Sequence, residues 1–196
     1  MDGVLDRYRE PSQLVQDKVI DHLDRHCSAF IALSPFATLS TADAGGWPDV
    51  SPRGGDPGFV RVLDERRLAV PDRPGNNRID SLRNVAANPR VALLFLVPGI
   101  EETLRVFGTA GTVAADDLDV DLTEFGRAPR SVLVVHVTKA YFQCAKAVMR
   151  SGLWDPERRV ERSAFAPMRE VFGDHCRLAT PLPDDAVMRA DLAQDL

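Results

Sequence analysis

The stretch PDRPGNNR, residues 71–78, places two arginines and two asparagines around a single glycine. Gly75 permits a left-handed backbone, and an asparagine can cap a helix that begins near Arg78. The first N–H groups of a helix are unpaired and partly positive, so they favour an anion. Arg73 and Arg78 add charge-assisted donors, and the turn therefore predicts a phosphate site. The alternative is an ordinary capped turn with solvated arginines.

Residues that could act as nucleophiles or metal ligands are scattered along the chain. Cys27, Cys144 and Cys176 form no CxxC pair, and Cys144 falls in a strand pattern that predicts a small buried hydrophobe. His22 and His26 stand four apart in a helical pattern without a third ligand nearby. GxSxG, Walker and GxGxxG motifs are missing from the sequence. We therefore expect no metal site, no disulfide framework and no side-chain nucleophile.

The elements that must position the turn are mainly short strands. Apolar residues recur at three- and four-residue spacing from Pro11 to Cys27, which predicts one amphipathic helix. A second helical pattern runs from Ile79 to Asn88 and stops at Pro89. Between the two helices, turn signals separate four candidate strands, which are FATLST, DVSPRG, FVRVL and RLAVP.

Three longer strands follow, with the sequences RVALLFLV, TLRVFGTAGTV and SVLVVHVTKAYFQC. Side chains alternate across a strand, so Thr103 and Arg105 are expected on the face opposite Leu104 and Val106. The last strand is apolar on both faces, which predicts burial on both sides or a subunit interface.

The order of these elements favours one antiparallel barrel. About six strands joined by hairpins, with few helices, predict a six-stranded barrel that is closed or partly open, rather than a doubly wound sheet. Helices are also expected over residues 164–172 and 184–195, in a tail too short to form a second domain. We therefore expect residues 1–196 to be a single α+β domain, mainly β.

Composition limits the partners of the chain. Its 196 residues carry 24 basic and 29 acidic side chains, a formal net charge of −5, without a clustered basic run. Nucleic-acid binding normally requires a basic face, so no nucleic-acid partner is expected. The N-terminus lacks a signal-peptide core, and the longest apolar run, VALLFLVPGI, is too short to span a bilayer. A cytoplasmic protein without a membrane partner is predicted.

Several of these segments occur together in a fixed order. FATLSTADAGGWPDVSPRG, LAVPDRPGNNRIDSLRNVAANPRVALLFLVPG and ETLRVFG follow one another, and CAKAVMRSGLW comes after them. This layout resembles the pyridoxamine 5′-phosphate oxidase-like superfamily, and in particular a bacterial subgroup that shares SPRG, PDRPGNNR and the late segment. The resemblance covers Pro11 to Pro156. It implies an FMN-binding split barrel with flanking helices, and a homodimer that holds the flavin between its subunits.

The resemblance also implies which residues hold FMN. The strand with SPRG would run along the flavin, and the turn and helix start would hold the phosphate and ribityl chain. TLRV would approach the flavin as well, and the late segment would reach it across the dimer interface. The implied FMN-binding residues are Ser51, Arg53, Arg73, Asn76, Asn77, Arg78, Ser81, Thr103, Arg105, Lys146, Arg150, Ser151 and Trp154.

The implied activity is that of an oxidoreductase acting on an unknown small molecule. FMN would transfer the hydride or electrons, and Arg53 or Arg105 would stabilise the negative charge of the reduced flavin. No side-chain nucleophile is then needed. Two alternatives stay open: a non-catalytic flavin carrier or sensor, and a deazaflavin- or haem-binding member of the same superfamily.

Overall fold

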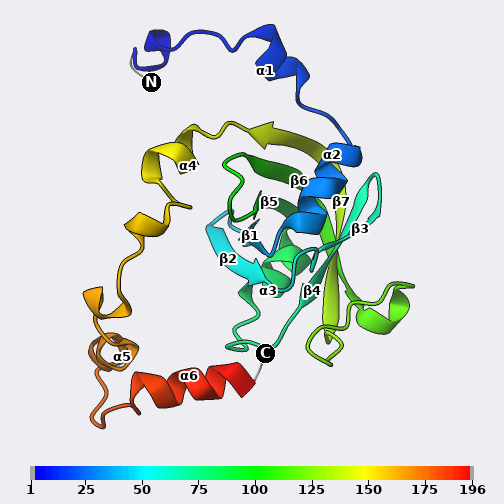
Figure 1. Cartoon of the computed structure of the whole chain (residues 1–196). Helices are drawn as coiled ribbons and strands as arrows, with labels where there is room; N and C mark the ends of the chain where they lie inside the picture. Colours follow the sequence, from blue (N-terminus) through cyan, green and yellow to red (C-terminus); the bar gives the residue numbers. More distant parts are fainter. Residues whose placement is uncertain (1–2, 195–196) are drawn as a thin grey trace.

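The computed structural model describes residues 3–194, in which one antiparallel sheet is surrounded by helices (Figure 1). The strands are β1 Phe36–Ala42, β2 Pro48–Gly54, β3 Arg61–Asp64, β4 Arg67–Asp72, β5 Arg90–Leu96, β6 Thr103–Ala114 and β7 Ser131–Gln143. The α-helices are α1 Gln13–Asp17, α2 Arg25–Leu33, α3 Asp80–Ala87, α4 Lys146–Ser151, α5 Met168–Cys176 and α6 Asp185–Gln194. The 3₁₀ turns are η1 Leu5–Arg7, η2 Ala115–Asp117, η3 Pro156–Arg158 and η4 Arg162–Ala164.

The sheet contains seven strands in the order β2-β1-β5-β6-β7-β4-β3, so the prediction of six strands is wrong by one. Each of the seven candidate segments contributes one strand, and FVRVL forms the short edge strand β3, which pairs with β4. β2 and β3 stand at the two ends of this order, and the barrel is therefore not closed by a hydrogen-bonded ladder. Across the open side, Arg53 Nη1 on β2 donates to Asp72 Oδ1 on β4 at 3.1 Å. A side-chain ion pair thus bridges the split.

The main core lies on the inward face of the sheet. Ala37 and Leu39 of β1 pair with Phe95 and Leu93 of β5, and all four are buried because side chains alternate along each strand. Helices α2 and α3 contribute further apolar residues to this core, namely Cys27, Phe30, Ile31 and Val85.

The helix predicted from Pro11 to Cys27 is interrupted, and this part of the prediction is wrong. Ile20, between α1 and α2, exchanges two backbone hydrogen bonds with Ala140 of β7. Extended pairing competes with helix formation at this point. Asp24 then caps the start of α2, where its side chain accepts two backbone N–H groups.

The first part of strand β7, residues 132–135, is buried on both faces within one copy of the chain, whereas His136, Thr138 and Lys139 are exposed. Leu133 and Val135 belong to the main core. On the other face, Val132 packs with Ala69 and Leu122 in a second, smaller cluster. The first of the two sequence alternatives, burial on both sides, is therefore confirmed for residues 132–135, and this buried stretch gives no evidence for a subunit interface.

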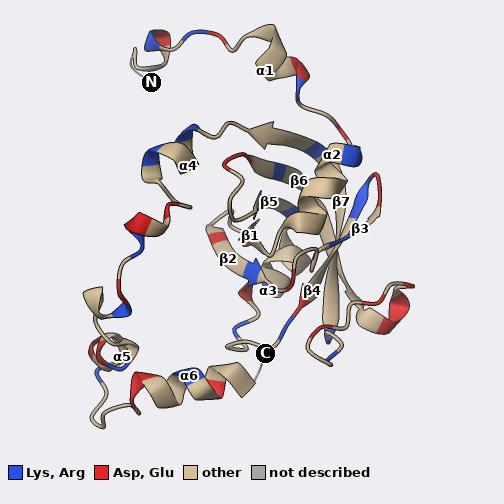
Figure 2. Ribbon diagram, in the orientation of Figure 1, with Lys and Arg blue, Asp and Glu red and all other residues tan. Residues whose placement is uncertain are grey.

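The chain after α4 runs along the side of the barrel (Figure 1). Helices α5 and α6 bury none of their residues, and acidic and basic residues alternate along this segment (Figure 2). The predicted tail helices are present, with α5 shifted toward the C-terminus, although residue 195 of the prediction lies outside the described residues. Within residues 3–194, every helix is too short or too polar to cross a membrane.

Candidate functional site

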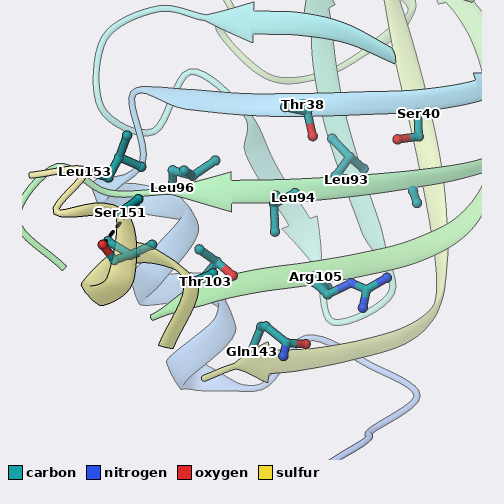
Figure 3. Close-up of a pocket in the computed structure, with 13 residues that line it drawn as sticks. Thr38, Ser40, Leu93, Leu94, Leu96, Thr103, Arg105, Gln143, Ser151 and Leu153 are labelled. Atoms are coloured by element: carbon teal, nitrogen blue, oxygen red, sulfur yellow. Dashed lines mark hydrogen bonds between the residues drawn. The ribbon is translucent and has the colours of Figure 1, made fainter. Parts of the chain in front are cut away.

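An open groove of about 520 Å³ lies on the outward face of β1, β5 and β6, bounded by the end of β7 and by α4 (Figure 3). Its floor follows the strand register, in which Thr38 stands opposite Leu94 and Leu94 stands opposite Arg105. The residues that line the groove are Thr38, Ser40, Ala92, Leu93, Leu94, Leu96, Thr103, Arg105, Gln143, Ala147, Val148, Ser151 and Leu153.

Three predicted site residues, Thr103, Arg105 and Ser151, meet in this groove. Leu104 and Val106 are fully buried on the opposite face, so the predicted alternation along β6 is confirmed. Thr103 and Arg105 approach from the sheet, whereas Ser151 approaches from the last turn of α4.

Sequence reasoning missed the other polar residues of the groove. Thr38 and Ser40 alternate with buried residues of β1, and this period-two pattern could have identified them. Gln143 stands opposite Thr103 in the β6–β7 register. Its position depends on pairing between distant segments, which no local pattern reveals.

The predicted phosphate turn leads into α3, but the helix start differs from the prediction. The N-cap residue is Ile79, with φ of 50°, and its side chain makes no capping hydrogen bond. The prediction of an asparagine cap is therefore wrong. Asn76 Oδ1 instead accepts the backbone N–H of Arg78 at 3.1 Å, and Asn77 adopts a left-handed φ of 57°. Both asparagines thus shape the turn that precedes the helix.

Arg78 is the exposed cation of this turn, with a side chain 74% exposed. Its Nε donates to Asp80 Oδ2 at 2.7 Å, and this hydrogen bond raises the pKa of Arg78. Exposed ion pairs contribute little to stability, so an incoming anion can replace this carboxylate at low cost. Ser81, in the first turn of α3, is buried instead.

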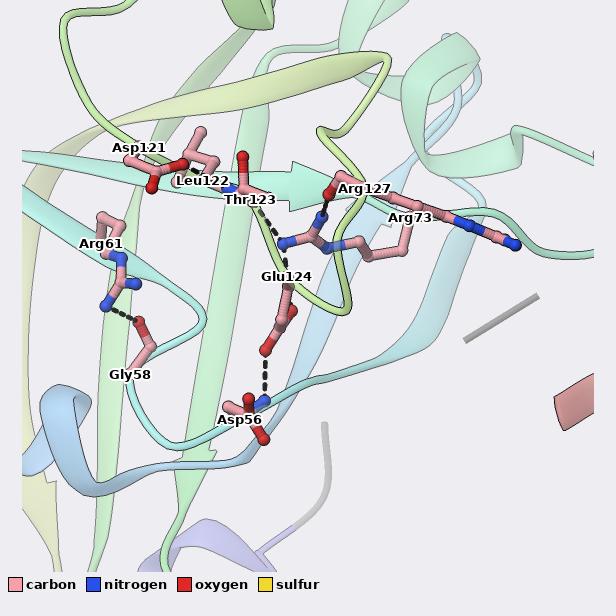
Figure 4. A network of polar contacts seen from close by, with 9 residues as sticks. All are labelled: Asp56, Gly58, Arg61, Arg73, Asp121, Leu122, Thr123, Glu124 and Arg127. Atoms are coloured by element: carbon pink, nitrogen blue, oxygen red, sulfur yellow. Dashed lines mark hydrogen bonds and ion pairs between the residues drawn. The ribbon is translucent and has the colours of Figure 1, made fainter. Parts of the chain in front are cut away.

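Arg73 holds the loop that follows β6 (Figure 4). Its Nη2 lies 3.0 Å from Glu124 Oε2, and its two terminal nitrogens donate to the carbonyl oxygens of Leu122 and Arg127. The Glu124 side chain is only 9% exposed, and its Oε1 accepts the backbone N–H of Asp56. Arg73 and Glu124 therefore tie three loops together.

Ser51 and Arg53 lie on the other side of the sheet from the groove. They pair with Leu39 and Ala37 of β1, whose side chains point into the core. Helix α3 packs on the same side, where Asn84 Nδ2 donates to Thr41 Oγ1 at 3.0 Å. None of the residues 73–81 lines the groove.

The segment after β7 contributes unequally to the groove. Lys146 and Arg150 of α4 are exposed and do not line it. Trp154 Nε1 donates to the carbonyl oxygen of Ile100 at 2.8 Å, which anchors this segment to the loop before β6. The predicted site residues are therefore divided between two sides of one sheet.

Cys144 is exposed, so the prediction of a buried cysteine is wrong. It follows Gln143, the last residue of β7, where the chain turns toward α4. A hydrogen bond from the Lys146 backbone, together with the charges of Lys146 and Lys18, lowers the pKa of Cys144. Burial has the opposite effect at Cys27, where it raises the pKa to about 12.

Comparison with known proteins identifies the family. Residues 23–144, more than half of the chain, match the family model described as Pyridoxamine 5′-phosphate oxidase. The chain therefore belongs to the pyridoxamine 5′-phosphate oxidase family, and the resemblance found in the sequence is confirmed. No match was found among curated proteins.

Solved structures with similar folds have low sequence identity to this chain. HupZ of Group A Streptococcus is 16% identical, with a TM-score of 0.47 and coverage of 62% of this chain and 99% of that one. An F420 reductase is 23% identical, with a TM-score of 0.42 and coverage of 58% and 94%. HutZ, a haem storage protein of Vibrio cholerae, is 19% identical, with a TM-score of 0.40 and coverage of 59% and 89%.

Proposed function

We propose that this chain is an FMN-dependent oxidoreductase that acts on a small molecule, and that it binds FMN between the two copies of a homodimer. The observation that carries the proposal is the division of the expected cofactor residues between two sides of one sheet. Thr103, Arg105 and Ser151 line the groove, whereas Arg78 precedes a helix on the other side. One flavin contacts both groups when one copy supplies the groove and the other supplies the turn, as two-fold symmetry permits.

The groove suits a flat ring system with polar edges. Its volume of about 520 Å³ is typical of small-molecule sites, which combine apolar walls with a few polar groups. Leu94, Leu96 and Leu153 provide the walls, and hydroxyl and amide groups from β1, β6 and β7 surround them. The usual protein ligands of haem are His, Cys, Met and Tyr, and none of these is among the described lining residues. The donor set therefore favours a flavin over haem.

The turn supplies the binding site for the phosphate. Arg78 makes the main charged contact, and Asn76 and Asn77 hold the backbone in the turn conformation. Arg73 acts through the loop contacts that it makes with Glu124, so it positions the turn. Trp154 anchors the segment that carries Ser151. In this proposal the exposed Lys146 and Arg150 of α4 reach the flavin across the dimer interface, as the resemblance implies.

Arg105 is the better of the two candidates for stabilising reduced flavin. FMN supplies hydride or electron transfer when it is bound. Arg53 is ion-paired with Asp72, whereas Arg105 forms no ion pair with any residue that the structure describes. Arg105 thus retains its positive charge for an anion in the groove. The proposal includes a cytoplasmic location, in keeping with the free cysteines.

Two measurements on the purified protein test this function. Mass spectrometry of the retained ligand should identify FMN, and anaerobic mixing with NADH or NADPH should bleach its absorbance. Retained deazaflavin or haem would contradict the choice of cofactor. If bound FMN stays oxidised with every donor tried, the protein is a flavin carrier or sensor and not an oxidoreductase.

A further inference from the structure

A row of cations and aromatic rings continues the groove along the outward face of β6 and β7. In the strand register Arg105 stands opposite Tyr141, and Phe107 stands opposite Lys139, so these four side chains share one face. The rings of Phe107 and Tyr141 are stacked, with centroids 5.9 Å apart. Lys18 reaches the ring of Tyr141 from the segment that pairs with β7. We call these five residues the cation–aromatic row.

The rings hold the cations in a fixed order along the row. Arg105 Cζ lies 5.0 Å from the centroid of Phe107 and 5.3 Å from that of Tyr141. Lys139 Nζ lies 4.3 Å from the Phe107 centroid, and Lys18 Nζ lies 5.7 Å from the Tyr141 centroid. Lys18 is further restrained by donating to the carbonyl oxygen of Phe142 at 2.8 Å. The row therefore presents three positive charges separated by two rings.

These charges are oriented without being neutralised. Elsewhere on the molecule arginines such as Arg53, Arg66 and Arg73 are paired with carboxylates. Among the residues that the structure describes, Lys18, Arg105 and Lys139 form no ion pair. A ring attracts a cation through its quadrupole and leaves the net charge in place. On a chain of net charge −5, three such cations in a row form a local site for an anion.

We propose that the cation–aromatic row binds the polyphosphate group of a small molecule whose other end enters the groove. This inference rests on the proposed function, because it names the chemical class of the molecule that meets the flavin. Arg105 belongs to both the row and the groove, so a ligand on the row extends into the cofactor site. Lys18 and Lys139 lie over different rings, so a chain of linked phosphates matches their spacing better than one phosphate group does.

The test measures binding of three probes by calorimetry, with and without added FMN: inorganic pyrophosphate, ADP and adenosine. Pyrophosphate and ADP should bind, and adenosine should not. Lys139→Gln should weaken both phosphate probes about ten- to a hundredfold, because it removes one charge-assisted contact. Arg189→Gln, which removes an exposed cation of α6 outside both the row and the groove, is the control and should change neither. Tighter binding of ADP than of pyrophosphate identifies a nucleotide as the source of the phosphates, and equal binding identifies free polyphosphate.

Three results would overturn the inference. Adenosine could bind as tightly as ADP, the control variant could lose as much affinity as Lys139→Gln, or Lys139→Glu could convert a dimer into a monomer. The last result would make the row a subunit contact. FMN affinity, measured separately by fluorescence quenching, should stay the same in Lys139→Gln. If the unaltered protein does not bind FMN, the proposed function is wrong. The probe titrations without FMN still test the cation–aromatic row in that case.

Discussion

At the scale of single residues, Arg78 is the side chain on which the proposed phosphate site depends most. Arg78→Ala should weaken FMN about ten- to a hundredfold, because it removes a charge-assisted hydrogen bond to the phosphate. Riboflavin lacks the phosphate, so its weaker binding should hardly change. Calorimetric titration of both ligands into both cofactor-free proteins isolates the phosphate contribution as a difference of differences. Equal losses for riboflavin and FMN would mean that Arg78 supports the ring site or the fold.

Cysteine reactivity should follow the contrast between Cys144 and Cys27. The thiolate is the reactive form, and the pKa of Cys144 is lowered whereas burial raises that of Cys27 to about 12. Iodoacetamide should therefore alkylate Cys144 in the native protein at mildly alkaline pH and leave Cys27 unmodified. Peptide mapping by mass spectrometry measures both sites, with Cys144→Ser as the control. Native-state labelling of Cys27 at a comparable rate would contradict the burial shown here.

At the scale of elements, Asp24 should stabilise α2 in a pH-dependent way. Desolvation raises the pKa of Asp24, but hydrogen bonds from Cys27 and His26 outweigh it, and the net pKa lies below 3.8. The stabilisation is therefore present above pH 3.8 and is lost as the pH falls through the lower, folded-state pKa. Asp24→Ala should cost about 0.5–2 kcal/mol of unfolding free energy at neutral pH. Asp24→Asn should keep most of the cap's hydrogen bonds to the backbone. Because asparagine does not titrate, urea unfolding should show that the contribution of its cap to the free energy of unfolding does not change with pH.

The loop network predicts that Gly55 cannot carry a side chain. A Cβ at Gly55 would lie 2.6 Å from the carboxylate of Glu124, so the side chain that pairs with Arg73 would have to move. Gly55→Ala should lower the unfolding free energy by about 1–3 kcal/mol, because a partly buried guanidinium loses its partner. Gly111→Ala is the matched control, since nothing lies within 4 Å of its added Cβ. Equal denaturation midpoints for the two variants would argue against the network.

Elements with a strong local pattern could be predicted from the sequence, and elements set by distant partners could not. The alternation along β1 and β6 places the groove face and the core face correctly, because each strand has one buried side. The break between α1 and α2 was missed because Ile20 pairs with Ala140, far along the chain. The role of Arg73 in the loop network depends in the same way on Glu124, whose position follows from the folded loops.

At the scale of the whole molecule, one copy supplies only half of the proposed cofactor site. The sheet separates the groove from the phosphate turn, and residues 132–135 of β7, the apolar stretch that could have formed a subunit interface, are buried within one copy. The case for a dimer therefore rests on the divided site. The expectation of a single domain over residues 1–196 stays a prediction, because α5 and α6 bury none of their residues.

Mixed dimers test this divided site most directly. One chain carries Leu94→Trp, which fills the groove from an outward position, and the other carries Arg78→Ala, which removes the phosphate contact. Two different affinity tags isolate the mixed dimer, and FMN titration counts its tight sites. If each site combines the groove of one copy with the turn of the other, one of the two sites escapes both changes. We predict one tightly bound FMN per mixed dimer, whereas each homodimer of a single variant binds weakly.

The reciprocal mixture carries both changes on one chain and none on the other. For a site shared between copies, each of its two sites then contains one defect, and we predict no tightly bound FMN. The opposite pair of results would contradict the account: no tight site in the first mixture and one tight site in the second would place the whole cofactor site within a single copy.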